Sequence, residues 1–325
     1  MTARTIAHYN LLDKIGEGGL GEVFRARDTR VGRTVALKLF PTAADAGACP
    51  ADLLADAQAA AAISHPNIAT LFDVGHADGV CYLAYEYVAG APLRASLGGG
   101  PMNPHRAFEL AVQLADALAE LEASGVVHGD IRPETIAVTA KGAAKLLDSG
   151  MSRWTRGGKT RRDASDPSSL PPDAGGVVEY LSPEQAVGME WNSRGDIFSL
   201  ATVLYEMLTG RNPFASPFPM DVVANVTGQE PPPVSPTAPG VPPDADRVLA
   251  KAMAKNVAYR YETAALFASE LRGVLAKLAD TSSVEKDNRY VLPIDDRADR
   301  LPPAVWIAIL GGIALLVAIG YWALR

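Results

Sequence analysis

The sequence is poor in cysteine and carries no excess of positive charge. Only two of its 325 residues are cysteines, Cys49 and Cys81. This excludes a disulfide framework and a cysteine-based zinc site, and it is typical of a reducing compartment. We interpret both cysteines as ordinary small residues. The net charge of -7 argues against a binder of nucleic acid or of anionic membrane surfaces, because such proteins need clustered positive charge.

The N-terminus also lacks a feature, namely the basic and apolar segments of a cleaved secretory signal. The C-terminus, in contrast, has an uncharged apolar run at residues 304–324. As a helix this run would be about 31 Å long, which matches the hydrocarbon thickness of a bilayer. Trp306, Tyr321 and Trp322 lie near its ends, where aromatic rings favour the membrane interfaces. We predict a transmembrane helix here; the alternative is a buried core helix.

The whole chain of 325 residues is 48% hydrophobic and is long enough to form a sizeable core. Residues 9–40 alternate or run apolar between Gly and Asp breaks and predict the strands of an antiparallel sheet. A helix is expected at 51–64, followed by two strands around the turn sequence HADG. After about residue 90, apolar residues at helical spacing predict a mainly helical part. Residues 273–303 are mixed and polar, and we interpret them as a linker.

Two features point to phosphate chemistry. The segment IGEGGLGEV at residues 15–23 has Gly16, Gly18, Gly21 and Val23 in the pattern G-x-G-x-x-G-x-V. Glycines there let backbone amides approach phosphate oxygens. The pattern alone is also compatible with a dinucleotide-binding fingerprint or a plain hairpin. Further on, Lys38 lies in an apolar strand. If its ammonium group is buried, it needs an anionic partner; if the strand lies at an edge, the ammonium group can remain in water.

Together with later motifs, these features make the chain similar to the protein kinase family, specifically the bacterial Ser/Thr kinases, over residues 9–272. Pro133 within the HGDIRPETI segment at residues 128–136 favours the Ser/Thr pattern over the tyrosine-kinase pattern. The residues that match the family's motifs are the glycines above, Lys38, HPNI at 65–68, Asp130, Asp148, Glu184 in LSPEQ, Asp196 and Arg260.

The resemblance implies an α+β fold with two lobes and a nucleotide between them. It implies an N-lobe at 1–88 and a C-lobe at 89–272. The composition of the chain adds the linker at 273–303 and the transmembrane helix at 304–324. ATP would be the nucleotide, with Mg²⁺ or Mn²⁺ as its metal. The hinge groups for adenine would be Glu86, Tyr87 and Val88, with Tyr85 behind them.

The resemblance also assigns roles to the polar residues of the site. Lys38 would contact the α and β phosphates, Asp148 the metal, and Asp130 the hydroxyl of the protein substrate. Arg132 replaces the family's lysine and keeps a positive charge near the γ-phosphate. Ion pairs are expected between Glu184 and Arg260, and Asp196 is expected to be buried as a structural residue.

Several positions depart from the family's pattern. Thr135 replaces the asparagine that helps to hold a second metal, and its shorter side chain puts that role in doubt. Asp56 replaces the glutamate that pairs with Lys38, so its helix would have to move inward by roughly 1 to 1.5 Å to restore the pair. Ser149 replaces the phenylalanine after Asp148. Gly129 replaces the family's arginine, which binds a phosphate on the activation segment. Val177 replaces the threonine that the family usually has in that segment.

Three functions follow as alternatives. The first is a membrane-anchored Ser/Thr kinase with reduced activity, and the second is a nucleotide-binding pseudokinase that acts as a scaffold or regulator. The third is a membrane protein that binds no nucleotide. Since ATP is cytoplasmic, the kinase interpretation places residues 1–303 on the cytoplasmic side of the inner membrane. Ala308 and Gly312 form a small-xxx-small pair that is compatible with a homodimer.

Overall fold

The computed structural model describes residues 4–18, 21–41, 49–98, 100–151, 154, 178–190 and 192–288. The chain divides into two compact units, Met1–Asp280 and Thr281–Arg325. The strands are β1 (Thr5–Ile6), β2 (Tyr9–Gly18), β3 (Gly21–Asp28), β4 (Thr34–Pro41), β5 (Leu71–Ala77), β6 (Val80–Glu86), β7 (Gly90–Pro92), β8 (Ile136–Thr139) and β9 (Ala144–Leu146). The helices are α1 (Ala51–Ala61), α2 (Leu93–Leu97), α3 (Pro104–Ala123), α6 (Pro183–Ala186), α7 (Ser193–Thr209), α8 (Pro219–Gly228), α9 (Asp244–Ala252), the 3-10 turn η3 (Val257–Tyr259) and α10 (Ala264–Asn288).

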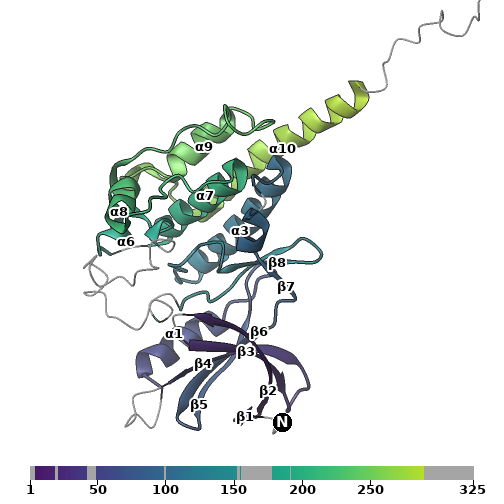
Figure 1. The fold of residues 1–325 in the computed structure, drawn as a ribbon, viewed down its shortest axis with the longest axis vertical. Coiled ribbons are helices and arrows are strands. Elements are labelled where there is room, and N and C mark those ends of the chain that lie inside the picture. The colour runs from purple at the N-terminus through teal and green to yellow at the C-terminus, as the bar shows by residue number, and fades with distance from the viewer. Residues whose placement is uncertain are drawn as a thin grey trace, which may run out of the picture. The chain divides into compact units, whose positions relative to one another are not determined.

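The N-terminal lobe is a curled antiparallel sheet with one helix beside it (Figure 1). The sheet has six strands in the order β1-β2-β3-β4-β6-β5, and α1 packs against β5. Asp78 and Gly79 both have positive φ in the turn between β5 and β6, as a tight two-residue hairpin requires. This confirms the expected strands and the turn at HADG.

The C-terminal lobe is mainly helical and is built around α3 and α7, which pack against each other (Figure 1). Helix α7 is buried at every position from Gly195 to Leu208, so it forms the centre of this lobe. Asn103 caps α3 and Asn192 caps α7, each by accepting a backbone hydrogen bond through its side chain. Gly210 ends α7 in the left-handed conformation, as its sequence position predicts. The two-lobed α+β architecture is therefore confirmed.

The interpretation of the two cysteines as ordinary small residues is wrong. Cys49 and Cys81 form a disulfide, with 5.6 Å between their Cα atoms. Cys49 lies just before α1, and Cys81 lies in β6. Because the two positions are 32 residues apart in the sequence, only the packing of α1 on the sheet brings them together.

Helix α10 continues to Asn288 and so includes the first part of the segment 273–303 that we interpret as a linker. The predicted transmembrane helix at 304–324 lies outside the described residues. Within the described ranges, no helix is both long and apolar enough to cross a bilayer.

Candidate active site

The glycine-rich segment forms a hairpin between β2 and β3. Gly16 pairs with Val23, and Gly18 pairs with Gly21. Gly21 has a φ of 125°, and a Cβ atom on it would lie 2.3 Å from the carbonyl oxygen of Leu39, so only glycine fits. Because the chain continues as strand β3 and not as a helix, the dinucleotide-binding alternative is excluded.

Lys38 lies in β4, in register with Val23 of β3 on one side and Leu83 of β6 on the other. Its Nζ lies 2.5 Å from Oδ2 of Asp148, and both side chains are largely buried. Asp148 follows β9 and has a φ of 61°, a left-handed conformation that is costly for a residue with a side chain. The structure thus brings together two residues that are 110 positions apart in the sequence.

The expected pair between Lys38 and Asp56 is not the contact that is observed. Among the described residues, the ion pair of Lys38 is with Asp148. Asp56 lies on α1 and accepts a hydrogen bond of 2.8 Å from Nε1 of Trp154. The Trp154 ring also packs against the buried cluster beneath α1, which includes Leu53 and Met151. Trp154, in the segment after Asp148, therefore binds the Asp56 carboxylate, which replaces the family's glutamate partner of Lys38.

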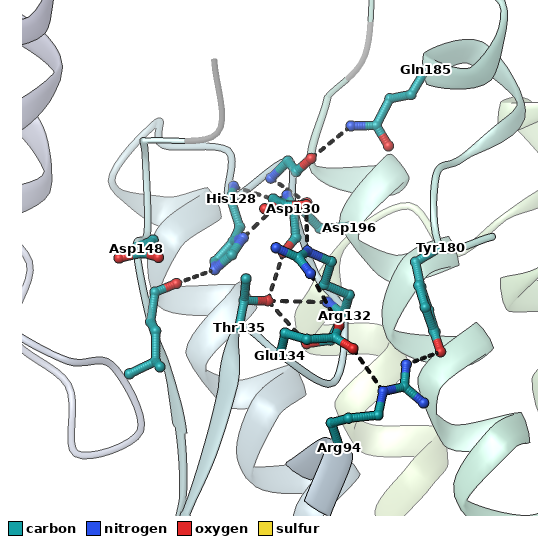
Figure 2. A network of polar contacts seen from close by, with 12 residues as sticks. Arg94, His128, Asp130, Arg132, Glu134, Thr135, Asp148, Tyr180, Gln185 and Asp196 are labelled. Atoms are coloured by element: carbon teal, nitrogen blue, oxygen red, sulfur yellow. Dashed lines mark hydrogen bonds and ion pairs between the residues drawn. The ribbon is translucent and has the colours of Figure 1, made fainter. Parts of the chain in front are cut away.

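The HGDIRPETI segment at residues 128–136, which the resemblance identifies as the catalytic loop, is fixed by a buried carboxylate from α7. Asp196 accepts backbone hydrogen bonds from His128 at 2.8 Å and from Gly129 at 2.7 Å. His128 in turn contacts the carbonyl of Leu147 through Nε2 and accepts the backbone N–H of Asp130 through Nδ1 (Figure 2). These contacts confirm Asp196 as a buried structural residue and place Asp130 beside the segment that carries Asp148.

Gly129 has a φ of 72°, so this position needs the left-handed conformation. Its carbonyl accepts a hydrogen bond from Nε2 of Gln185, which follows Glu184 in the chain (Figure 2). An arginine at position 129 would adopt this backbone at a cost, whereas glycine adopts it freely. Gly129 therefore adopts this backbone without strain and offers no side chain that could bind a phosphate.

Thr135 uses its hydroxyl to close the catalytic loop. Oγ1 lies 2.7 Å from the carbonyl oxygen of Asp130 and 3.0 Å from that of Arg132, and it accepts the backbone N–H of Arg132 (Figure 2). A hydroxyl has one proton to donate and two lone pairs. The side chain is buried and largely committed to the loop, so its main role in this structure is to hold Asp130 and Arg132 in place.

We expect Thr135→Val to lower the free energy of unfolding by about 1–3 kcal/mol, because buried loop groups lose their partner. Urea denaturation measures the change. Thr202→Val is the matched control, since its hydroxyl bonds the carbonyl of Phe198 within α7, where the helix already supplies an amide partner. Equal losses in the two variants would contradict the role of Thr135 in the loop.

A network that the sequence did not reveal surrounds the catalytic loop. Arg132 links Asp130 and Glu134, at 3.2 Å from each. Arg94 of α2 contacts Glu134 and the hydroxyl of Tyr180 (Figure 2). It also contacts Glu206 of α7. Burial raises the pKa of Tyr180, and the charge of Glu206 adds to the effect. Arg94 therefore connects α2, the catalytic loop and the residues before α6, and no local sequence pattern signals this role.

The predicted pair between Glu184 and Arg260 is confirmed. The guanidinium of Arg260 donates to both carboxylate oxygens of Glu184 at 2.7 Å, and the arginine side chain is fully buried. Burial alone would raise the pKa of Glu184, but the hydrogen bonds and charge of Arg260 lower it overall. The pair ties the segment around α6 to the residue that follows η3.

The hinge residue Glu86 ends β6. Its backbone N–H donates to the carbonyl of Thr70, and its side chain accepts a hydrogen bond of 2.9 Å from Lys145 of β9. The strand end is therefore held from both lobes. The adenine contacts expected at Glu86 and Val88 stay a prediction.

The residues fit one metal ion better than two. Asp148 presents a carboxylate, the ligand type that Mg²⁺ prefers, and phosphate oxygens and water commonly complete its shell. Thr135 does not fit the second position, because its hydroxyl is engaged by the loop. Within the described ranges, no cluster of three or more His, Cys, Asp or Glu side chains forms a metal site. The buried hydroxyls of Tyr85 and Ser149 lack a hydrogen-bond partner there, which leaves polar groups available around Asp148.

Comparison with known proteins agrees with this geometry. The model of the protein kinase domain matches residues 9–270. The serine/threonine-protein kinase PknB of Mycobacterium leprae is 38% identical over 273 residues, which cover 81% of this chain and 42% of that protein. The serine/threonine-protein kinase PknD of Mycobacterium tuberculosis is 39% identical over 260 residues, 79% of this chain and 38% of that protein.

The chain thus spans less than half the length of these curated relatives. The family match, however, includes both lobes, the glycine hairpin, Lys38, the catalytic loop and Arg260. The chain belongs to the protein kinase family.

Proposed function

We propose that the chain is an ATP-dependent Ser/Thr protein kinase that transfers the γ-phosphate of ATP to hydroxyl groups of proteins, at a reduced rate. The observation that carries the proposal is that Lys38, Asp130 and Asp148 are all present and held by the fold. The similarity to relatives named as serine/threonine-protein kinases supports the substrate class.

The residues have separable tasks in the proposed reaction. Lys38 contacts the phosphates of bound ATP and neutralises their charge as the leaving group forms. Asp130 lies at the start of the catalytic loop and accepts the proton of the substrate hydroxyl. Magnesium bound at Asp148 would supply further charge neutralisation to the phosphates. Arg132 keeps the Asp130 carboxylate oriented through a hydrogen bond of 3.2 Å.

The reduced rate follows from two contacts. Asp56 bonds Trp154 and not Lys38, so in this arrangement α1 does not help to orient the lysine. Thr135 gives its hydroxyl to the loop, so a second metal would lack the ligand that the family supplies. A pseudokinase that binds nucleotide and works as a scaffold is the second candidate, and these same two contacts favour it.

Nucleotide binding is the first test of the proposal. At an ATP concentration of 100 times Kd, Mg-ATP is expected to stabilise the wild type by about 2.7 kcal/mol. Lys38→Met should lose most of this shift because the phosphates lose their cation. Thermal denaturation with and without Mg-ATP measures it, with Lys251→Met on α9 as the control. Equal shifts in both variants, or no shift in the wild type, would contradict the proposed site.

We also propose that residues 304–324 anchor the chain in the inner membrane with residues 1–303 on the cytoplasmic side. The support is the uncharged apolar run with aromatic residues at its ends, together with the requirement of the proposed reaction for cytoplasmic ATP. Protease treatment of spheroplasts should leave the large domain intact. Its digestion from outside would reject this orientation.

A further inference from the structure

The disulfide between Cys49 and Cys81 joins the two elements whose relative position matters most to the site. Cys49 lies two positions before the first residue of α1, the helix that carries Asp56. Cys81 lies in β6, the strand that continues to Tyr85 and Glu86. The bond therefore ties the start of α1 directly to the sheet.

The disulfide is also part of the buried cluster that supports α1. This cluster contains both cysteines, Leu53 and Ala57 of α1, and Met151, which comes three residues after Asp148. A change at the disulfide therefore affects the packing of α1 and of the segment that follows Asp148. Protein interiors are densely packed, so such a change is transmitted to the neighbouring side chains.

The position of α1 decides whether Asp56 can act on Lys38. Aspartate is one methylene shorter than glutamate, so α1 must move inward to bring the carboxylate to the lysine. In this structure α1 is tethered by the disulfide, and Asp56 accepts the indole N–H of Trp154 at 2.8 Å. The tether restrains the motion that the pair between Asp56 and Lys38 requires.

We propose that Cys49 and Cys81 form a thiol–disulfide switch: the oxidised form holds α1 in the arrangement seen here, and reduction frees α1 to approach Lys38. The activity part of this inference rests on the proposed kinase function. The structural part, the release of α1 on reduction, is independent of the proposed kinase function. The chain's only two cysteines are the two partners of this bond, one just before α1 and the other in β6.

The chemistry of the switch is thiol–disulfide exchange with a dithiol. A thiolate of the dithiol attacks Sγ of Cys49, which is 7% exposed, whereas Cys81 is fully buried. The protein S–S bond breaks, and Cys81 leaves as a thiolate that takes up a proton. The second sulfur of the dithiol then displaces Cys49, which also takes up a proton. Two electrons pass to the protein, and the dithiol becomes a cyclic disulfide.

The proposed cytoplasmic location favours a regulatory bond over a permanent one. Disulfides of cytosolic proteins are usually transient and serve catalysis or redox sensing, because the thiol pools of that compartment keep cysteines reduced. In this setting the reduced, more active form would be the resting state. Oxidation by a low-molecular-weight disulfide would run the same exchange in reverse and restore the tether.

The test compares the oxidised full-length chain in detergent with the same sample treated with dithiothreitol. Mass spectrometry after alkylation confirms the state of both cysteines. Hydrogen exchange is then followed in peptides that cover Leu53–Ala60, and transfer from γ-labelled ATP is measured in parallel. Cys49→Ser is the control, because it cannot form the bond and should behave like the reduced wild type in both buffers.

We expect reduction to speed exchange in α1 by roughly tenfold and to raise phosphate transfer several-fold. Equal exchange in the two redox states, or the same response to dithiothreitol in Cys49→Ser, would overturn the switch. Faster exchange in α1 with no phosphate transfer in either state would support the release of α1 and reject the kinase activity instead. The two failures are therefore distinguishable.

Discussion

Asp130→Asn is expected to lower the rate of phosphate transfer by about 10²- to 10⁴-fold, the usual contribution of a positioned general base. Asparagine has nearly the same shape, and its amide oxygen can still accept the hydrogen bond from Nε of Arg132, which is 3.2 Å long in the wild type. An amide, however, does not accept the proton of the substrate hydroxyl. The loss should therefore fall on the rate constant, with little change in stability.

Asp116→Asn is the matched control for this substitution. Asp116 lies on α3 and pairs with Arg272 of α10 in a partly exposed position, so its loss should leave the rate unchanged. Initial rates with γ-labelled ATP and melting temperatures are measured for both variants. If Asp130→Asn and Asp116→Asn lowered the rate of phosphate transfer by the same small factor, Asp130 would not be the general base.

Arg260→Ala has the largest expected effect on stability. It leaves the carboxylate of Glu184, which is 12% exposed, without its two hydrogen bonds of 2.7 Å. Removing one partner of a buried ion pair costs about 3–5 kcal/mol. Arg247→Ala is the control, because Arg247 and Glu270 form an exposed pair for which less than about 1 kcal/mol is expected. Urea denaturation of the three proteins gives the free energies of unfolding.

The effect of Arg260→Ala should depend on pH. Arg260 holds the pKa of Glu184 below 4.5 in the folded protein. The stability from the pair is therefore fully present above pH 4.5 and is lost as the pH falls through the lowered folded pKa. The difference between wild type and variant should shrink on acidification. A difference that is constant from neutral pH to well below pH 4 would show that it arises from packing and not from the ion pair.

Local patterns of the sequence predicted the elements of this fold well. The alternation of apolar residues predicted β2, β3 and β4, and Gly210 marked the end of α7, because such signals depend on neighbours in the chain. The motif resemblance singled out Lys38 and Asp148, which the structure brings into contact although no local pattern joins them. Apolar residues at helical spacing likewise predicted the helices of the second lobe.

Contacts that depend on the packing of distant segments were missed. The disulfide links positions 32 residues apart, and its cysteines have no spacing that would signal a pair. Arg94 and Glu206 are separated by 112 positions, so their contact depends on how α2 lies against α7. No local pattern signals the role of Trp154, whose indole holds Asp56. In each case the side chain gained its role from a tertiary contact.

The most direct test of the central claim is whether the wild-type chain transfers phosphate at all. The 325-residue chain, with its disulfide reduced, is incubated with Mg²⁺ and γ-labelled ATP, and the labelled amino acids are identified beside an Asp130→Asn sample. The account predicts phosphoserine or phosphothreonine well above the level of the variant. Label equal to that of Asp130→Asn, while ATP still raises the melting temperature of both proteins, would contradict it and show a nucleotide-binding pseudokinase.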